Sequence, residues 1–439
     1  MARYIKAAEM LIAILLAALP CGCTSDNEKA AVTDASQDIR VLNWIQDIDY
    51  MQTNLLQKHK NLYHSIKKED FDKEVIDLKN DVPKLKDYEI ICRLAQIVAS
   101  IGDAHTSLDL NFNNSLPYPI RLLWFGEDLR VVNTDSEHKD ILGRKLVNIN
   151  GIPINEIVKK ADSLIAHENS QRLKAEDPQY IVIPEVLKMF GIISSDTAEF
   201  TFRGDDNSIS KLKLTPGVLT PANRVSVFNE MPVRPLRSQY DYNSFTDNLY
   251  WYRYIPEDKI LYFQYNHCTD KGIAQKRGIK DFEKYPDFDV FSEGLLKAIS
   301  ENDVGKFIID LRYNSGGDSR LFTGLARKLA GIDKLKGKIY VMIGRETFSS
   351  AVIATIDLMN KTNAVFYGEP TGGNVNGYGN NKFLVLPNSK LYISYSTKYF
   401  NLSSKFKENF IPDVKVQETF KDFKDGIDGV YEAIRNSKN

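Results

Sequence analysis

The sequence predicts an α/β fold in its C-terminal half, preceded by a helical region and a β-rich region. Three patterns support this division. Beyond residue 250, apolar strands alternate with helical stretches, an order that implies right-handed parallel crossovers. Residues 39–101 carry apolar side chains at three- and four-residue intervals, which is typical of amphipathic helices. Between these regions, from residue 116, short β-rich runs are separated by turn residues.

The N-terminal residues predict export. After a basic start, the apolar run over residues 10–19 is too short to span a bilayer as a helix. Gly22 stands directly before Cys23, and residues 1–23 resemble a bacterial lipoprotein signal with Cys23 as the lipidated residue. The alternative is an ordinary signal peptide or a weak membrane anchor. We therefore expect an exported lipoprotein of the cell envelope, anchored to the membrane, with the polar residues 24–38 as a flexible tether.

Composition excludes several classes of protein. The formal net charge is −1, so the chain lacks the basic excess that would neutralise the phosphates of a nucleic acid. Cys92 and Cys268 lie far apart in apolar settings, which favours buried free thiols and leaves a disulfide open. The six histidines are scattered without metal-ligand spacing. We expect no nucleic-acid partner, no metal and no organic cofactor.

Residues 39–115 are expected to form a helical cap. No strand pattern interrupts this segment, and Gly102 is a plausible helix stop shortly before His105. The apolar positions at helical spacing in its first part are Val41, Trp44, Ile45, Ile48 and Met51.

Residues 116–217 are expected to form a β-rich domain. The runs 118–125 and 129–132 are separated by turn-like residues, and Asn150-Gly151 between apolar runs is a strong signal for a tight turn. A helix over 155–166 and a strand pair at 198–202 and 211–214 complete the pattern.

This order of elements resembles a PDZ domain, in which a G-x-x-L-x-x-I-N-G motif leads into the helix beside the peptide groove. PDZ domains bind an extended peptide as an added strand. The alternative is a β-rich insertion without a binding function, and the short motif leaves both interpretations open.

Residues 218–439 are expected to form the α/β core. The continuous apolar run over 306–311 is typical of a buried parallel strand. Further strands are expected at 259–265, 338–343 and 364–367, and helices at 291–300, 321–329 and 350–359.

Two strand-to-helix joints carry candidate chemistry. The first, D-L-R-Y-N-S-G-G, ends at Gly316-Gly317, where glycines let backbone N–H groups approach an oxyanion. The second, G-R-E-T-F-S-S-A, places Ser349 and Ser350 at the start of a helix, where negative charge is stabilised. The alternative for Ser349 is a simple helix cap, a role that serine often has.

The two joints are followed by G-E-P-T-G-G at residues 368–373, and the three motifs in this order resemble the C-terminal processing peptidases and tricorn-like peptidases. The resemblance implies a crotonase-like α/β core with a PDZ-like domain before it. It also implies that Ser349 is the nucleophile, and that the oxyanion hole is built from backbone N–H groups of Ser350 and of the Gly316-Gly317 turn.

The general base expected from this resemblance depends on the branch of the family. Processing peptidases have a lysine after the third motif, and Asn374 stands there in this chain. The tricorn-like branch has an upstream histidine, and I-G-D-A-H-T resembles its G-D-x-H-T motif, which implies His105 as the base. Ala104 stands where that branch commonly has serine. Glu408 resembles the glutamate of the same branch, which would orient His105 or bind the substrate amino group.

The resemblance therefore implies an exported serine peptidase that hydrolyses peptide bonds through an acyl-enzyme on Ser349, with His105 as general base and a peptide or protein as substrate. The alternative is a non-catalytic ligand- or peptide-binding lipoprotein on the same fold, because fold does not fix function. A hydrolase acting on non-peptide esters is a further possibility.

Overall fold

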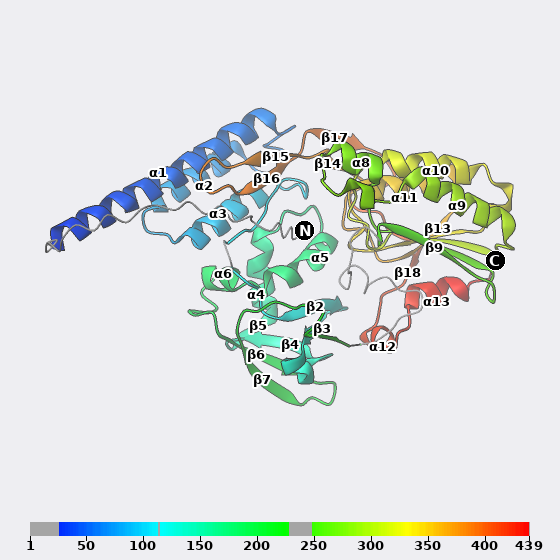
Figure 1. Cartoon of the computed structure of the whole chain (residues 1–439), viewed down its shortest axis with the longest axis horizontal. Coiled ribbons are helices and arrows are strands. Elements are labelled where there is room, and N and C mark those ends of the chain that lie inside the picture. The colour runs from blue at the N-terminus through cyan, green and yellow to red at the C-terminus, as the bar shows by residue number, and fades with distance from the viewer. Residues whose placement is uncertain (1–25, 113–114, 228–247, 439) are drawn as a thin grey trace, which may run out of the picture.

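The computed structural model describes residues 26–112, 115–227 and 248–438 (Figure 1). The expected signal sequence and its Cys23 lie outside these residues. In the described part of the chain, no helix combines the length and the apolar character needed to cross a membrane.

The N-terminal region is helical, as the sequence predicts. It contains α1 (Asp26–Lys58), α2 (Lys68–Asp81) and α3 (Asp87–Ala99). The prediction of a tether over residues 24–38 needs correction, because α1 already begins at Asp26. No glycine or proline lies between Thr24 and Lys58, so nothing in the sequence stops the helix from extending toward the N-terminus.

The cap also contains a small sheet that the sequence pattern does not reveal. β1 (Ser107–Leu108) pairs with β16 (Tyr392–Tyr395), which pairs with β15 (Lys382–Val385). Figure 1 shows β15 and β16 beside the cap helices, although they come from the C-terminal part of the chain. Asp47 of α1 holds the turn of this hairpin, since its carboxylate accepts the N–H groups of Asn388 at 2.8 Å and Ser389 at 2.7 Å.

The middle region is β-rich, as expected, and its strands form an antiparallel sheet. Asn150 and Gly151 both have positive φ, 48° and 79°, and form the predicted tight turn. The sheet contains β2 (Ile120–Phe125), β3 (Asp128–Asp135), β4 (Lys145–Ile149), β6 (Ala198–Arg203) and β7 (Ile209–Leu214) in this order, with β5 (Ile152–Pro153) beside β4 and β8 (Arg224–Ser226) beside β3.

The helices of the middle region differ in part from expectation. α4 (Ile154–Ala161) forms as predicted but gives way to a 3-10 turn at Asp162–Leu164. α5 (Ser170–Tyr180) and α6 (Pro184–Met189) were not predicted. α5 is polar and contains a proline, so its sequence lacks apolar periodicity.

The C-terminal region contains the predicted parallel sheet. Its order is β18 (Val414–Lys415), β13 (Val365–Gly368), β12 (Ile339–Ile343), β11 (Lys306–Asp310), β10 (Ile260–Tyr265) and β9 (Tyr250–Ile255), and only β9 is antiparallel to its neighbour among these described strands. β10, β11 and β12 are buried along their whole length, which explains why their sequences are almost continuously apolar.

Helices cover both faces of this sheet (Figure 1). One face packs against α9 (Phe288–Glu301), α10 (Arg320–Ala330) and α11 (Ser350–Lys361), and the other against α13 (Gly429–Arg435). The remaining elements are α8 (Lys271–Lys276), α12 (Phe420–Lys424), the pair β14 (Asn376–Gly379) and β17 (Lys398–Asn401), and 3-10 turns at Ser136–Ile141, Phe282–Lys284 and Asp333–Leu335. Cys92 and Cys268 are buried free thiols, as favoured by the sequence.

Candidate active site

Ser349 lies at the sharp turn between β12 and α11. Its backbone has φ 54° and ψ −122°, a conformation that side-chain-bearing residues rarely adopt. Ser349 occupies the N-cap position of α11, yet its side chain makes no capping hydrogen bond. The helix-cap interpretation therefore does not account for this serine, whose hydroxyl is left available at a strained turn.

Hydrogen bonds between the two predicted motifs hold this turn in place. The buried Thr347 hydroxyl donates to the Leu311 carbonyl at 2.9 Å, and the Phe348 N–H donates to the Asn314 carbonyl at 2.9 Å. The Ser350 hydroxyl donates to the Gly317 carbonyl at 2.8 Å. The strand-to-helix joints after β11 and β12 therefore form one rigid unit.

The Gly316-Gly317 turn lies against Ser349, but its two N–H groups have different roles. The Gly316 N–H donates to the Asn314 side-chain carbonyl at 2.8 Å, which corrects the expectation that it is free to bind an oxyanion. A Cβ on Gly316 would lie 2.6 Å from Ser349 Cβ, and one on Gly317 would lie 2.3 Å from the Cys268 carbonyl. Within the described residues, the N–H groups of Gly317 and Ser350 donate no hydrogen bond.

His105 lies between α3 and β1, and the fold brings it next to Phe348, the residue before Ser349. Its ring stacks on Phe348 with 4.5 Å between ring centroids. No hydrogen bond joins the His105 and Ser349 side chains in the described residues. Burial lowers the pKa of His105 to about 4, so its imidazole is neutral at pH 7.

Asp103 anchors the segment that carries His105. One carboxylate oxygen accepts the His105 N–H at 2.8 Å and the Ser396 hydroxyl at 2.8 Å. The other accepts the Thr106 hydroxyl at 2.7 Å and lies 2.8 Å from His59 Nε2. Burial alone would raise the pKa of Asp103, but the bonds from His59, Thr106 and Ser396 outweigh it and lower the pKa to about 2.

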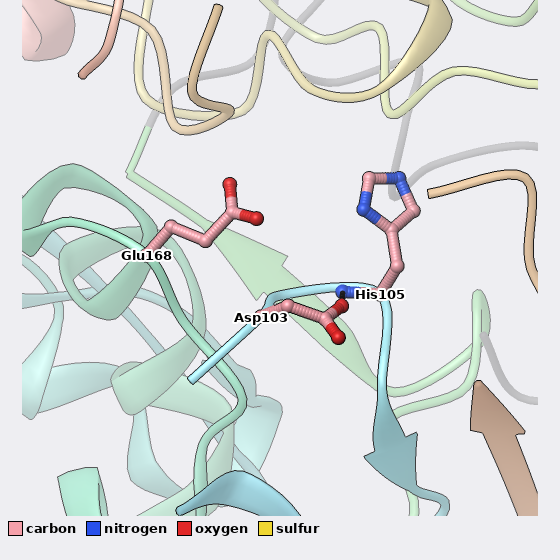
Figure 2. A group of neighbouring side chains, drawn as sticks. All are labelled: Asp103, His105 and Glu168. Carbon is pink, nitrogen blue, oxygen red and sulfur yellow. Dashed lines mark hydrogen bonds between the residues drawn. The ribbon is translucent and has the colours of Figure 1, made fainter. Parts of the chain in front are cut away.

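Glu168 is a site residue that the sequence analysis missed. Ligand atoms of Asp103, His105 and Glu168 lie within 4.8 Å of one another, and Figure 2 shows the Glu168 carboxyl group and the His105 ring on the same side of Asp103. Burial raises the pKa of Glu168 to about 7, helped by the charge of Asp103. No motif surrounds Glu168 in the sequence, so only the fold could reveal it.

A divalent cation is a poor occupant for this cluster. Each Asp103 oxygen already has two hydrogen-bonding partners, so Asp103 offers no free ligand atom to a metal. We therefore interpret the three residues as a hydrogen-bonding and proton-holding cluster.

Glu408 and Asn374 lie on neighbouring backbone segments. The Glu408 carbonyl accepts the Val375 N–H at 2.8 Å, but its side chain is exposed, and the described part of the chain shows no hydrogen bond or ion pair of its carboxylate. The side-chain carbonyl of Asn374 accepts the Asn169 amide at 2.9 Å, so this position supplies no base. The structure thus brings Ser349, Ser350 and Gly317 together and stacks His105 on Phe348, next to Ser349 in the chain. Within the described residues, the Glu408 side chain makes no hydrogen bond or ion pair with His105.

The start of α5 completes the surroundings of the site. Asn169 caps α5 through the N–H groups of Gln171 and Arg172, and its amide also donates to the Gly372 carbonyl at 3.0 Å. The Arg172 guanidinium lies 4.3 Å from the centroid of the Phe348 ring. The Phe348 ring therefore contacts both Arg172 and His105.

No family model and no curated protein matches this chain. Several solved structures do. Mature CPAF complexed with lactacystin is 12% identical, with a TM-score of 0.63 over 90% of this chain and 97% of that chain. Mature CPAF is 11% identical, with a TM-score of 0.62 over 90% and 96%. A serine-to-alanine mutant of CPAF is 11% identical, with a TM-score of 0.63 over 91% and 99%. The chain therefore has the overall fold of CPAF.

Proposed function

We propose that this chain is a serine peptidase that cleaves peptide bonds through an acyl-enzyme on Ser349. One observation carries the proposal. Ser349 stands at a strained strand-to-helix turn, and its hydroxyl makes no capping hydrogen bond to the helix. The Gly316-Gly317 turn lies directly beside it. Backbone strain of this kind persists at functional sites because the surrounding structure enforces it.

In the proposed reaction, Ser349 Oγ attacks the substrate carbonyl while His105 takes the hydroxyl proton. The N–H groups of Gly317 and Ser350 stabilise the negative charge that develops on the carbonyl oxygen. When the C–N bond breaks, His105 returns the proton to the leaving amine, and water then hydrolyses the ester on Ser349. His105 suits the role of base because it is neutral at pH 7. Its hydrogen bond to Ser349 has to form when substrate binds, since catalytic bonds are often long in free enzymes.

The wider architecture is also part of the proposal. The order of strands and the Asn150-Gly151 turn support a PDZ-like domain over residues 116–217, and the parallel sheet supports a crotonase-like core over residues 218–439. The signal motif supports export and lipid anchoring at Cys23.

An active-site fluorophosphonate probe tests the catalytic proposal. We expect covalent labelling of the wild-type protein and none of Ser349→Ala, with both proteins equally folded by circular dichroism. A folded wild-type protein that stays unlabelled from pH 5.5 to 9 would instead favour the non-catalytic binding protein. Assays with peptide and ester substrates then distinguish a peptidase from a hydrolase of non-peptide esters, because the ester hydrolase would leave all peptides intact.

A further inference from the structure

One ring nitrogen of His105 is left without a partner inside the protein. Among the described residues, His105 Nδ1 is buried without a hydrogen-bond partner, while the Tyr378 backbone lies close enough to the ring to favour its protonated form. Leaving a buried polar atom unpaired is unfavourable, so such an atom needs an explanation. Figure 2 shows one ring nitrogen on the side of the Glu168 carboxyl group. The ligand atoms of these two residues lie within 4.8 Å, so a hydrogen bond between them needs a side-chain movement that brings them closer.

Glu168 is better placed for this bond than the other two carboxylates considered. Both oxygens of Asp103 are already engaged with His59, Thr106, Ser396 and the His105 backbone. Glu408 is exposed and has no recorded contact with His105 in the described residues. Of these three carboxylates, Glu168 combines closeness to the His105 ring with an oxygen that has room to accept a hydrogen bond.

The protein holds Glu168 toward the site from three sides. The Asn374 N–H donates to its carboxylate at 3.4 Å, and the Ala104 backbone also favours the ionised form. A Cβ on Gly377 would lie 3.0 Å from a Glu168 oxygen, so the absence of a side chain there makes room for the carboxyl group. The charged groups that face it are Asp103 from the segment after α3 and Arg172 from α5.

We propose that Glu168 is the positioning carboxylate of this site, acting through His105. In its ionised form it accepts a hydrogen bond from one ring nitrogen, while the other nitrogen takes the proton of Ser349. The negative charge then stabilises the imidazolium until the proton passes to the leaving amine. This inference rests on the proposed peptidase function and assigns to Glu168 the role that the sequence suggested for Glu408.

The proposal has a pH signature. Because the pKa of Glu168 is about 7, the carboxyl group is mostly neutral at pH 6 and mostly ionised at pH 8. Asp103 stays ionised and His105 stays neutral over this range, so neither produces a step there. The rate of acylation should therefore rise through a midpoint near pH 7.

The test measures the rate of fluorophosphonate labelling of Ser349 from pH 5.5 to 9. For Glu168→Gln we expect a rate at least about 10-fold below wild type at pH 8 and no midpoint near pH 7. Glu168→Asp should restore part of the rate and the midpoint, because it keeps the charge. Glu199→Gln is the matched control and should behave as wild type, because the half-buried Glu199 carboxylate of β6 pairs with Lys211 of β7.

If the midpoint near pH 7 in the labelling rate persists in Glu168→Gln, the proposal is overturned. If the midpoint is lost in Glu408→Gln instead, Glu408 is the carboxylate that positions His105. A wild-type protein that is never labelled refutes the peptidase function itself. The contact between Glu168 and His105 can also be measured in an inactive protein, from the pH dependence of the NMR chemical shifts of the His105 ring. A step near pH 7 that disappears in Glu168→Gln supports the contact, and an unchanged titration contradicts it.

Discussion

At the scale of single residues, Ser349 shows how a catalytic candidate differs from an ordinary helix cap. Ser and Thr at the start of a helix normally use the hydroxyl to accept a backbone N–H. Ser349 does not, and its backbone adopts a positive φ that costs about 1–3 kcal/mol in a residue with a side chain. A residue with only a structural role would gain nothing from this strain.

This strain predicts that two substitutions of Ser349 with the same effect on activity differ in stability. Ser349→Ala and Ser349→Gly both remove the hydroxyl and should both abolish labelling. Glycine tolerates the φ of 54°, so Ser349→Gly should be more stable than Ser349→Ala by about 1 kcal/mol, after allowing for the greater freedom of glycine in the unfolded chain. Urea unfolding of the two variants measures the difference, and a Gly variant less stable than the Ala variant would show that the turn is not strained.

At the scale of elements, α5 joins the middle region to the candidate site. Its first turn contacts the Gly372 loop and Phe348, and its last part contacts β2 through Asp177, which accepts the Trp124 indole N–H at 2.7 Å. Asp177 is buried, and burial raises its pKa to about 7, partly offset by the bond from Trp124. The junction between α5 and β2 is thus sensitive to pH.

The folded-state pKa of Asp177 lies above that of an unfolded Asp, about 3.9, so the native state holds the extra proton. The corresponding stability is fully present below about pH 4 and is lost as the pH rises through 7. Asp177→Asn keeps an acceptor for Trp124 but does not titrate. Between pH 6 and 8 the wild-type protein should lose about 1.4 kcal/mol more unfolding free energy than Asp177→Asn.

Guanidinium unfolding of both proteins at pH 6 and pH 8 measures this difference. Glu168 and Glu346 also have pKa values raised to about 7 by burial, but they titrate equally in both proteins and cancel in the comparison. Equal losses in wild type and Asp177→Asn would show that Asp177 is already ionised at pH 6.

At the scale of the whole molecule, the site depends on regions far apart in the chain. The cap supplies His105, the middle region supplies Glu168, and the C-terminal core supplies Ser349. One continuous apolar core connects the cap, the middle sheet and the β15–β16 hairpin, so these parts hold His105 and Glu168 in a fixed relation. A second core under the parallel sheet supports the Ser349 turn.

Membrane attachment is a property of the whole protein that the sequence alone predicts. If Cys23 carries the lipid, Cys23→Ala should lose incorporation of labelled palmitate and move from the membrane fraction to the soluble fraction. Cys21→Ala should change neither, because Pro20 occupies the position before Cys21 and disfavours cleavage there. Membrane attachment that survives in Cys23→Ala would point to an uncleaved N-terminal segment instead.

Local sequence patterns were enough to predict many of the helices and strands. The buried strands β10 to β13, the Asn150-Gly151 turn and the helix after Ser349 all follow from apolar periodicity and turn residues within a few positions. The sequence also identified the serine turn, because that motif is contiguous. It missed α5, whose polar sequence is helical only in its tertiary setting.

The tertiary structure decided which distant groups meet. In the folded protein, the Gly316 N–H donates to the Asn314 side chain, and β1 pairs with β16. Glu168 lies near His105, whereas Glu408 is exposed. None of these contacts has a local signature, because each joins side chains or backbone groups that lie apart in the sequence or depends on how a turn packs. Backbone conformation is encoded over a few residues, whereas the partners of a buried polar group are fixed only when separate elements pack together.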